Sequence, residues 1–241
     1  MNPLSQKQLF DYEKDGYLIL PSVLAPSDIA EIHKEILEHL NDVEARFVED
    51  EAYQKIRMYR RFAVGLHIKK EKIRTFVSSP IFKEIGKAFI GNEVDLFGTS
   101  TIVKSEGRNR SIDWHQDLAY DKGQDLSRII CWTSITESHP ENGGLFIFPG
   151  SHKLGLQPHE KSELYERDVQ TIGVDEKKAL PLHLEKGQII VLHPLVIHGS
   201  SENRTNSDRV ALMSMYQKPK FYSEQEMKIK MEILRENEQA A

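Results

Sequence analysis

The fold is indicated most clearly by residues 193–216, which read HPLVIHGSSENRTNSDRVALMSMY. Two apolar runs, 195–198 and 209–217, flank a stretch of turn-forming residues, so this segment predicts a strand, a loop and a returning strand. We expect this return to bring Arg209 close to His198. Because Arg209 is a charged residue at the edge of an apolar run, it is expected to enter the interior and to need a partner there.

The same pattern extends back to residue 94. Short runs rich in β-branched and aromatic residues alternate with turns such as Asn142-Gly143-Gly144. The predicted strands are 94–104, 112–118, 128–136, 144–149, 180–184, 188–192, 195–198 and 209–217. About eight short strands in one stretch predict a jelly roll, in which two antiparallel sheets pack face to face.

The N-terminal part, about residues 1–92, is predicted to be largely helical. Apolar residues recur there at three- and four-residue spacing, as expected for helices with one buried side. The predicted elements are helices over 5–15, 26–45 and 80–90, with a strand at 16–20. Residues 49–75 have a mixed pattern that predicts neither type.

The jelly-roll core is expected to span about residues 93–218. Residues 151–179 are long for a loop and are expected to include a short helix, and a polar helix at about 223–238 follows the core. Because no linker separates these parts, we expect a single domain over 1–241, mainly β with flanking helices.

Composition and charge exclude several classes of protein. The chain has 241 residues and a net charge of −5, which argues against a nucleic-acid partner or an anionic-membrane surface. No apolar run approaches the roughly 20 residues that span a bilayer, and the N-terminus lacks a secretory profile. Cys131 is the only cysteine, so no internal disulfide forms, and a cytoplasmic setting is expected.

Two histidines and one carboxylate form the most informative candidate site. A His-x-Asp/Glu pattern is weak alone, because it occurs at 33–35, 115–117, 139–141 and 183–185. On a strand, however, a two-residue step returns side chains to one face, so His115 and Asp117 are expected to point the same way. His198 is expected to supply a third ligand. Two histidines and one carboxylate are the ligand set of non-haem Fe(II) oxygenases, and this set leaves coordination positions on the metal open.

Two alternatives to this metal site remain. His193 is a rival third ligand, because Pro194 can change the parity of the strand that leads to His198. The other alternative is that these side chains are ordinary polar residues lining the sandwich.

Arg209 and Ser200 are candidates for anchoring an anionic ligand beside the metal. A guanidinium holds a carboxylate through two parallel hydrogen bonds. Ser200 lies two residues beyond His198, hence on the same face, and its hydroxyl can donate to the same carboxylate. The alternative is a structural ion pair between Arg209 and Asp208, Glu202 or a core aspartate.

Four ordered motifs resemble the phytanoyl-CoA dioxygenase family. They are WHQDL (114–118), CWTS (131–134), NGGLFIFPGSHK (142–153) and HPLVIHGS (193–200), followed by Arg209. The resemblance covers roughly residues 5–220. It implies an Fe(II)- and 2-oxoglutarate-dependent oxygenase on a double-stranded β-helix, a cupin-like jelly roll. Enzymes that hydroxylate small molecules such as ectoine belong to the same superfamily.

The resemblance also implies roles for individual residues. The implied iron ligands are His115, Asp117 and His198, and the implied contacts of 2-oxoglutarate are Arg209, Ser200 and Trp132. Further co-substrate contacts are expected upstream, with Thr101, Lys104, Arg60 and Arg61 as candidates. In halogenating relatives a small residue replaces the carboxylate ligand, so Asp117 favours hydroxylation or a related oxidation.

The expected function is oxidation of a small-molecule or acyl-thioester substrate. This would be coupled to decarboxylation of 2-oxoglutarate to succinate and CO2, with O2 as oxidant and ascorbate as an auxiliary reductant. The alternatives are a non-catalytic jelly-roll protein that binds metal or ligand and a cupin-like metal-dependent hydrolase or isomerase. Co-occurrence of the triad and the arginine disfavours the non-catalytic protein, and sites of the hydrolase or isomerase kind usually have a fuller histidine shell. The oligomeric state is left open.

Overall fold

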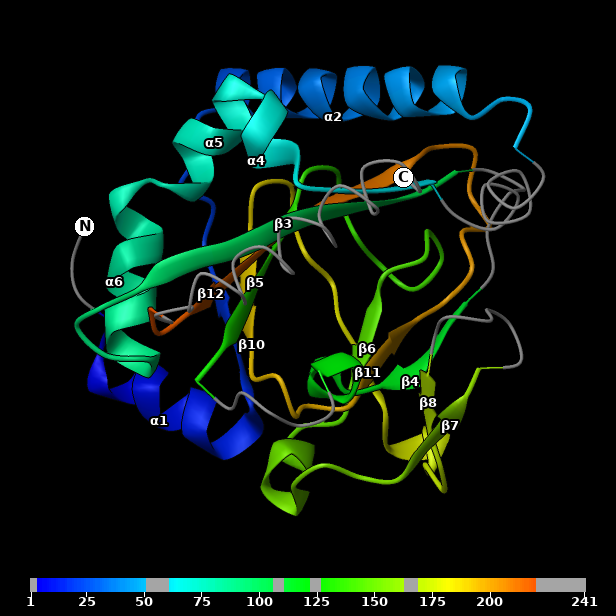
Figure 1. Cartoon of the computed structure of the whole chain (residues 1–241). Coiled ribbons are helices and arrows are strands. Elements are labelled where there is room, and N and C mark those ends of the chain that lie inside the picture. Colours follow the sequence, from blue (N-terminus) through cyan, green and yellow to red (C-terminus); the bar gives the residue numbers. More distant parts are fainter. Residues whose placement is uncertain (1–3, 51–60, 106–110, 122–126, 163–168, 220–241) are drawn as a thin grey trace, which may run out of the picture.

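A computed structural model of the chain describes residues 4–50, 61–105, 111–121, 127–162 and 169–219. Figure 1 shows two β-sheets, with the N-terminal helices gathered along the larger one. Within the described residues, no helix combines the length and apolar character needed to cross a bilayer.

The larger sheet has six antiparallel strands in the order β1-β10-β5-β12-β3-β2. Its strands are β1 (Tyr17–Leu20), β2 (Arg61–Val64), β3 (Asp95–Lys104), β5 (Ile129–Ser134), β10 (Ile189–Leu192) and β12 (Arg209–Gln217). One of the two middle strands, β12, pairs with β3 over its whole length. The two strands at the edges of the sheet, β1 and β2, come from the helical N-terminal part, so that part completes the sheet.

The smaller sheet faces the larger one and has the order β4-β11-β6-β9. Its strands are β4 (Ile112–His115), β6 (Leu145–Ile147), β9 (Leu180–Pro181) and β11 (His198–Ser200). A separate antiparallel pair, β7 (His159–Lys161) and β8 (Val169–Thr171), lies in the segment between β6 and β9. Two antiparallel sheets face to face confirm the predicted jelly roll.

Within the described residues, five helices accompany the larger sheet, and their ends follow sequence signals. They are α1 (Gln6–Asp15), α2 (Pro26–Arg46), α4 (Leu66–Lys69), α5 (Glu71–Val77) and α6 (Pro80–Phe89). The hydroxyl of Ser5 accepts a hydrogen bond from the amide of Gln8 and so caps α1. Gly16 ends α1 with a φ of 80°, a left-handed conformation that favours glycine. Proline begins both α2 and α6, where its missing amide hydrogen costs nothing.

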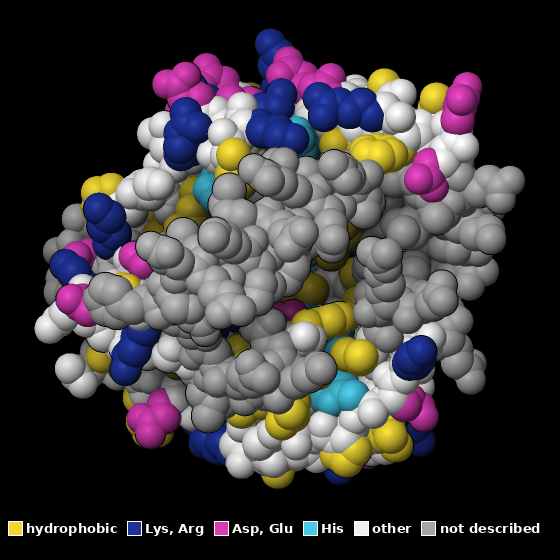
Figure 2. Space-filling model, viewed as in Figure 1, with side chains coloured by type: hydrophobic (Ala, Val, Ile, Leu, Met, Phe, Trp, Pro, Cys, Tyr) yellow, Lys and Arg dark blue, Asp and Glu magenta, His cyan; other side chains and the backbone are white. Residues whose placement is uncertain are grey.

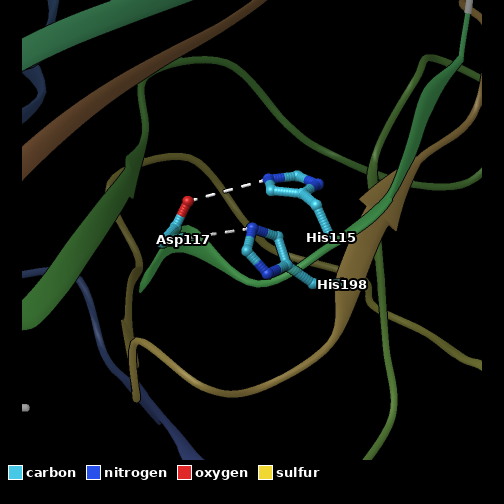
Figure 3. Close-up of side chains that lie close together, drawn as sticks. All are labelled: His115, Asp117 and His198. Carbon is cyan, nitrogen blue, oxygen red and sulfur yellow. Dashed lines mark ion pairs between the residues drawn. The ribbon is translucent and has the colours of Figure 1, made fainter. Parts of the chain in front are cut away.

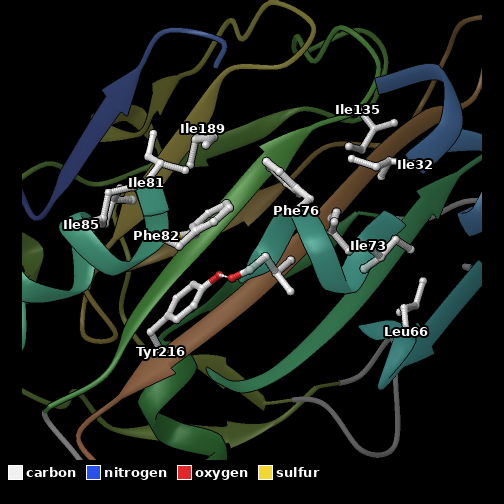
Figure 4. Close-up of a cluster of buried hydrophobic side chains, with 14 of the residues drawn as sticks. Ile32, Leu66, Ile73, Phe76, Ile81, Phe82, Ile85, Ile135, Ile189 and Tyr216 are labelled. Carbon is white, nitrogen blue, oxygen red and sulfur yellow. Dashed lines mark hydrogen bonds between the residues drawn. The ribbon is translucent and has the colours of Figure 1, made fainter. Parts of the chain in front are cut away.

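The main hydrophobic core lies between these helices and the outer face of the larger sheet (Figure 4). Phe82 of α6 is fully buried, and its ring stacks on Tyr216 of β12 at 5.4 Å and meets Phe76 of α5 edge-on at 4.9 Å. The hydroxyl of Tyr216 donates to the carbonyl of Val77 at 2.6 Å. A second, smaller cluster lies on the inner face, between the two sheets.

Two predicted strands differ from the structure at the candidate site. The strand predicted over 112–118 ends at His115, and a 3-10 turn over Asp117–Asp121 follows, begun by a bond from the amide of Ala119 to the carbonyl of Gln116. The strand predicted over 195–198 is instead a turn, because Val196 donates back to the carbonyl of His193 across Pro194. His198 therefore begins a strand rather than ending one.

Other expectations for the elements were less specific. The mixed segment 49–75 contains β2, α4 and most of α5 within its described part. In 151–179, the expected short helix corresponds to the 3-10 turns Ser151–Leu154 and Glu176–Lys178, and β7 and β8 were not expected. The helix predicted at about 223–238 lies outside the described residues.

Candidate metal centre and anion pocket

Three side chains converge between the two sheets (Figure 3). His115 ends β4 and His198 begins β11, and the two residues are paired across these strands. Asp117 starts the 3-10 turn, with one carboxylate oxygen 3.6 Å from Nε2 of His115 and the other 3.8 Å from Nε2 of His198. One ligand atom from each side chain lies within 4.8 Å of the others, and no other such group occurs within the described part of the chain.

Backbone carbonyls orient the two imidazoles. Nδ1 of His115 lies 2.8 Å from the carbonyl oxygen of Asp113, and Nδ1 of His198 lies 3.1 Å from that of Val196. Because a carbonyl oxygen only accepts, each Nδ1 donates its proton there, and each Nε2 is left to face Asp117. Histidines that bind metals through Nε2 are held by second contacts of this kind.

The charges in the cluster favour the forms that bind a metal. Burial raises the pKa of Asp117, but the charge of His198, a hydrogen bond from His115 and the nearby guanidinium of Arg128 outweigh burial and lower it. Burial and the charge of His115 lower the pKa of His198. An ionised carboxylate and neutral imidazoles are the states that metal coordination requires.

The cluster opens onto a cavity of about 330 Å³ between the sheets. Apolar side chains form most of its wall, among them Phe62, Phe97, Ile102, Leu118, Ile130 and Met213. Its polar groups include the candidate residues Ser200 and Arg209, and Trp132 also lines it. Figure 2 shows hydrophobic side chains gathered at a hollow near the middle of one face of the molecule.

Arg209 is a buried cation on the inner face of β12. It is 1% exposed, and its guanidinium carbon lies 5.5 Å from the centre of the Trp132 ring. One of its terminal nitrogens donates to the carbonyl of Ile102 at 3.4 Å, and its Nε has no hydrogen-bond partner among the described residues. Burial lowers the pKa of Arg209 to about 9. A buried guanidinium in this state is suited to receive an anion.

Ser200 completes this part of the wall. It lies two residues after His198 on β11, and its hydroxyl is also buried without a partner among the described residues. Within that part of the chain, no ion pair joins Arg209 to Asp208 or Glu202; Glu202 instead lies 3.9 Å from Arg204. The structure therefore does not bear out the ion-pair alternative.

The rival ligand and the described upstream candidates make other contacts and are not among the residues that line the cavity. His193 packs against Tyr12 and His152, at ring distances of 6.3 and 5.0 Å. The hydroxyl of Thr101 donates to the carbonyl of Ala211, and the ammonium of Lys104 to that of Ser201. Arg61 forms an ion pair with Glu44 at 2.6 Å. Arg60 lies outside the described residues.

Gln116 connects the two halves of the cluster, a role that strand parity alone did not reveal. It is fully buried, and its amide nitrogen donates to the carbonyls of Leu195 at 2.6 Å and Gly155 at 3.0 Å. Its amide oxygen accepts from the backbone of Gln157 at 2.8 Å. Gln116 thus fixes the segment carrying His115 and Asp117 against the turn that precedes His198.

Fold and cluster together define a class: jelly-roll proteins with a two-histidine, one-carboxylate cluster beside a buried arginine. Residues 12–211 match the family model described as phytanoyl-CoA dioxygenase (PhyH). The chain therefore belongs to the phytanoyl-CoA dioxygenase family, whose members are Fe(II)- and 2-oxoglutarate-dependent dioxygenases. This confirms the resemblance predicted from the four motifs.

Individual relatives agree with this assignment. The chain is 29% identical to the human peroxisomal phytanoyl-CoA dioxygenase over 234 residues, covering 88% of this chain and 68% of that protein. It is 26% identical to an ectoine dioxygenase of Streptomyces anulatus over 174 residues, covering 70% of this chain and 59% of that protein.

Solved structures show the same fold. EvdO2 from Micromonospora carbonacea var. aurantiaca, complexed with 2-oxoglutarate, aligns with a TM-score of 0.71 at 21% identity, covering 92% of this chain and 94% of that one. EctD from S. alaskensis, with 2-oxoglutarate and 5-hydroxyectoine, aligns with a TM-score of 0.70 at 19% identity, covering 90% of this chain and 77% of that one.

Proposed function

We propose that this protein hydroxylates, or otherwise oxidises, a small-molecule or acyl substrate at a single ferrous ion, coupled to conversion of 2-oxoglutarate to succinate and CO2. The observation that carries the proposal is one cavity containing both the triad and a buried guanidinium whose Nε has no partner among the described residues.

The side chains fit the metal. Two neutral imidazoles and one carboxylate are the ligands of the facial triad of non-haem Fe(II) oxygenases, and they leave coordination positions open. We assign the three ligands to His115, Asp117 and His198, whose ligand atoms already lie within 4.8 Å of one another. When bound there, ferrous iron together with 2-oxoglutarate supplies the oxygen activation.

The side chains also fit the co-substrate. Arg209 offers a planar pair of donors to the distal carboxylate of 2-oxoglutarate, and the hydroxyl of Ser200 offers another. Their buried donor groups lack partners within the described part of the chain, and a bound carboxylate would satisfy them. Trp132 beside Arg209 would pack against the carbon chain of the same molecule.

The remaining lining defines the reaction environment. Asp117 occupies the metal position that halogenating enzymes leave to a small residue, so we assign hydroxylation or a related oxidation rather than halogenation. The mainly apolar wall would exclude water once a substrate is bound, which strengthens the electrostatic contacts inside. Gln116 would hold the two ligand-bearing segments at fixed separation.

The two alternative functions are less well supported. A non-catalytic jelly-roll protein has no need for a buried arginine beside open metal positions. A cupin-like hydrolase or isomerase commonly has a fuller histidine shell, whereas here His193 lies in a separate contact with Tyr12. The main core is shared by helices and sheet, which supports a single domain. The cytoplasmic location stays a prediction; the names of the mammalian relatives specify the peroxisome for those proteins.

A binding and turnover experiment tests the proposed function. Fe(II) added anaerobically with 2-oxoglutarate should produce the visible charge-transfer absorption of the chelated co-substrate. Air should then release succinate, faster in the presence of a true substrate. Absence of both signals would overturn the proposed function. Turnover with Zn(II) or Mn(II) that needs no 2-oxoglutarate would favour the hydrolase or isomerase alternative.

A further inference from the structure

We propose that His159 is a positioning residue of the metal centre. Its imidazole accepts a hydrogen bond from the backbone amide of Gln116, the residue between His115 and Asp117. His159 is not one of the three ligands and acts through this amide. The inference rests on the proposed function, because it takes His115 and Asp117 as metal ligands, and it adds to the site a residue that no sequence motif marked.

The segment between β6 and β9, which contains β7 and β8, contacts the ligand-bearing segment at several points. Nε1 of Trp114 donates to the carboxylate of Glu176 at 2.9 Å, and the hydroxyl of Ser162 donates to the carboxylate of Asp113. Both residues that precede His115 are therefore anchored to this segment. His159, the first residue of β7, extends the same anchoring to the residue that follows His115.

The contacts of His159 define which ring nitrogen carries the proton. Nδ1 lies 2.7 Å from the carbonyl oxygen of Gln157, which only accepts, so Nδ1 is the donor. Nε2 lies 3.4 Å from the amide nitrogen of Gln116, which only donates, so Nε2 is the acceptor. The ring is thus neutral, with its proton on Nδ1. Burial lowers the pKa of His159, which favours this neutral form.

Gln116 lies outside the regular elements of its own segment. β4 ends at His115 and the 3-10 turn begins at Asp117, so Gln116 belongs to neither. The residue is fully buried, and a backbone amide shielded from water needs an acceptor. The imidazole of His159 provides this acceptor where no neighbouring strand does so.

The β7–β8 hairpin holds the imidazole in place. His159 is paired with Thr171 of β8, whose side chain is buried and whose hydroxyl lies 3.0 Å from Nε2. The amide of Ile172 donates to the carbonyl of Pro158 at 3.0 Å, which fixes the backbone before β7. A ring with contacts at both nitrogens has little rotational freedom, so the position of the Gln116 amide is defined by a rigid partner.

The consequence concerns the spacing of two ligands. Nε2 of His115 and one oxygen of Asp117 are 3.6 Å apart, and Gln116 is the single residue that joins them along the chain. If its amide is no longer held, the two side chains lose part of their preorganisation. Partners that orient metal ligands typically contribute tenfold or more to metal affinity.

Two polar substitutions separate the two ring nitrogens. Glutamine places its side-chain amide near the position of Nε2, so His159→Gln keeps an acceptor for Gln116. Asparagine places its amide near Nδ1, so His159→Asn keeps the contact with Gln157 and loses that acceptor. We expect Mn(II) affinity, measured by calorimetry with 2-oxoglutarate present, to fall about tenfold in His159→Asn and to stay within about threefold of wild type in His159→Gln. The visible absorption of Co(II)-loaded protein, which reports ligand geometry, should change in His159→Asn only.

Controls make the result specific. His183→Asn makes the same chemical change at an exposed histidine and should bind Mn(II) as wild type does. Thr171→Val removes the other donor to Nε2 from the same hairpin but leaves the amide of Gln116 its acceptor, so its Mn(II) affinity should stay within about threefold.

The contrary outcomes are distinct. Unchanged Mn(II) affinity in His159→Asn, equal losses in His159→Asn and His159→Gln, or an equal loss in Thr171→Val overturns the inference while the proposed function stands. If a variant does not fold, long-range proton–nitrogen NMR of wild-type protein at pH 8 decides: a proton on Nε2 of His159 overturns the inference, and a proton on Nδ1 supports it. Failure of wild-type protein to bind Mn(II) and 2-oxoglutarate would instead reject the proposed function.

Discussion

The two faces of β12 differ in what their side chains contact. On the outer face, Val210, Leu212 and Tyr216 pack into the main core beneath the helices. On the inner face, Arg209, Met213 and Met215 line the cavity. The outer face ends in a polar group with a partner, since the hydroxyl of Tyr216 donates to Val77, whereas Nε of Arg209 has none among the described residues.

This difference separates stability from binding along a single strand. Close packing of large apolar side chains stabilises the outer face, whereas burying a cation on the inner face opposes folding unless an anion joins it. Active sites commonly reduce stability in this way. Substitutions on the outer face should therefore lower stability and leave the site intact. Substitutions on the inner face should weaken binding and leave the fold intact.

The largest expected effect is on the inner side. Asp117→Ala should reduce 2-oxoglutarate-dependent succinate release by about a thousandfold or more, which corresponds to about 4 kcal/mol in activation free energy. The physical reason is loss of the only anionic member of the triad. Calorimetry with Mn(II) should show the matching loss of metal affinity, while Asp11→Ala on the surface of α1 keeps both. Retained activity in Asp117→Ala would show that this carboxylate is not a metal ligand.

The outer face should respond in the opposite way. Phe82→Ala should lower the free energy of unfolding by about 3–5 kcal/mol, because it opens a cavity in a fully packed region. Denaturant unfolding measures this, with Phe10→Ala, at a position 64% exposed, as the near-neutral control. Folded Phe82→Ala protein should bind Mn(II) as wild type does. A large fall in metal affinity would show that the two faces are coupled.

Arg209→Met should change both quantities in opposite directions. Affinity for 2-oxoglutarate should fall by about a hundredfold, because two charge-assisted hydrogen bonds are lost. The ligand-free protein should keep or gain stability, because a buried cation is replaced by an apolar side chain of similar length. Calorimetry and the thermal midpoint of ligand-free protein check this. A destabilised variant with unchanged 2-oxoglutarate affinity would assign Arg209 a structural role.

The sequence predicted the members of the cluster better than the backbone that positions them. His115 and Asp117 were paired by strand periodicity, yet the strand ends at His115 and a 3-10 turn carries Asp117. The pairing survives because Gln116 ties the turn to distant backbone groups, contacts that local periodicity does not encode.

Arg209 and His198 illustrate the same limit over a longer distance. A strand, a loop and a returning strand were expected to bring them together. Instead β11 and β12 belong to different sheets, and the two residues line opposite walls of one cavity. The pairing of β1 and β2 with the edges of the larger sheet is likewise long-range, and hydrophobic periodicity determines which segments form strands but not their neighbours.

The smallest predicted effect concerns His193, the histidine that the sequence could not separate from the metal ligands. Its Nδ1 accepts a hydrogen bond from the amide of Leu195 at 3.1 Å, which requires the neutral ring. Burial, with a contribution from the charge of His152, lowers the pKa of His193 to about 4. In the unfolded chain the pKa of this histidine is near 6.5, so between pH 6.5 and 4 the unfolded chain binds more protons than the folded protein. The contribution to stability is therefore full above pH 6.5 and falls as the pH decreases toward 4.

His193→Gln should reduce this acid sensitivity, because glutamine can accept the same hydrogen bond and does not titrate. Because His193 is partly exposed, the effect should be small. Relative to wild type, the free energy of unfolding of His193→Gln should be only about 1 kcal/mol more favourable at pH 5 than at pH 7. Unfolding measured across this pH range should show the flatter profile, with the exposed His183→Gln as control. Metal affinity at neutral pH should be unchanged, because His193 packs beside Tyr12 and not in the cavity. Loss of metal binding in His193→Gln would reverse the assignment of the third ligand, whereas a flatter acid profile with intact binding would place His193 with the stabilising outer region of the molecule.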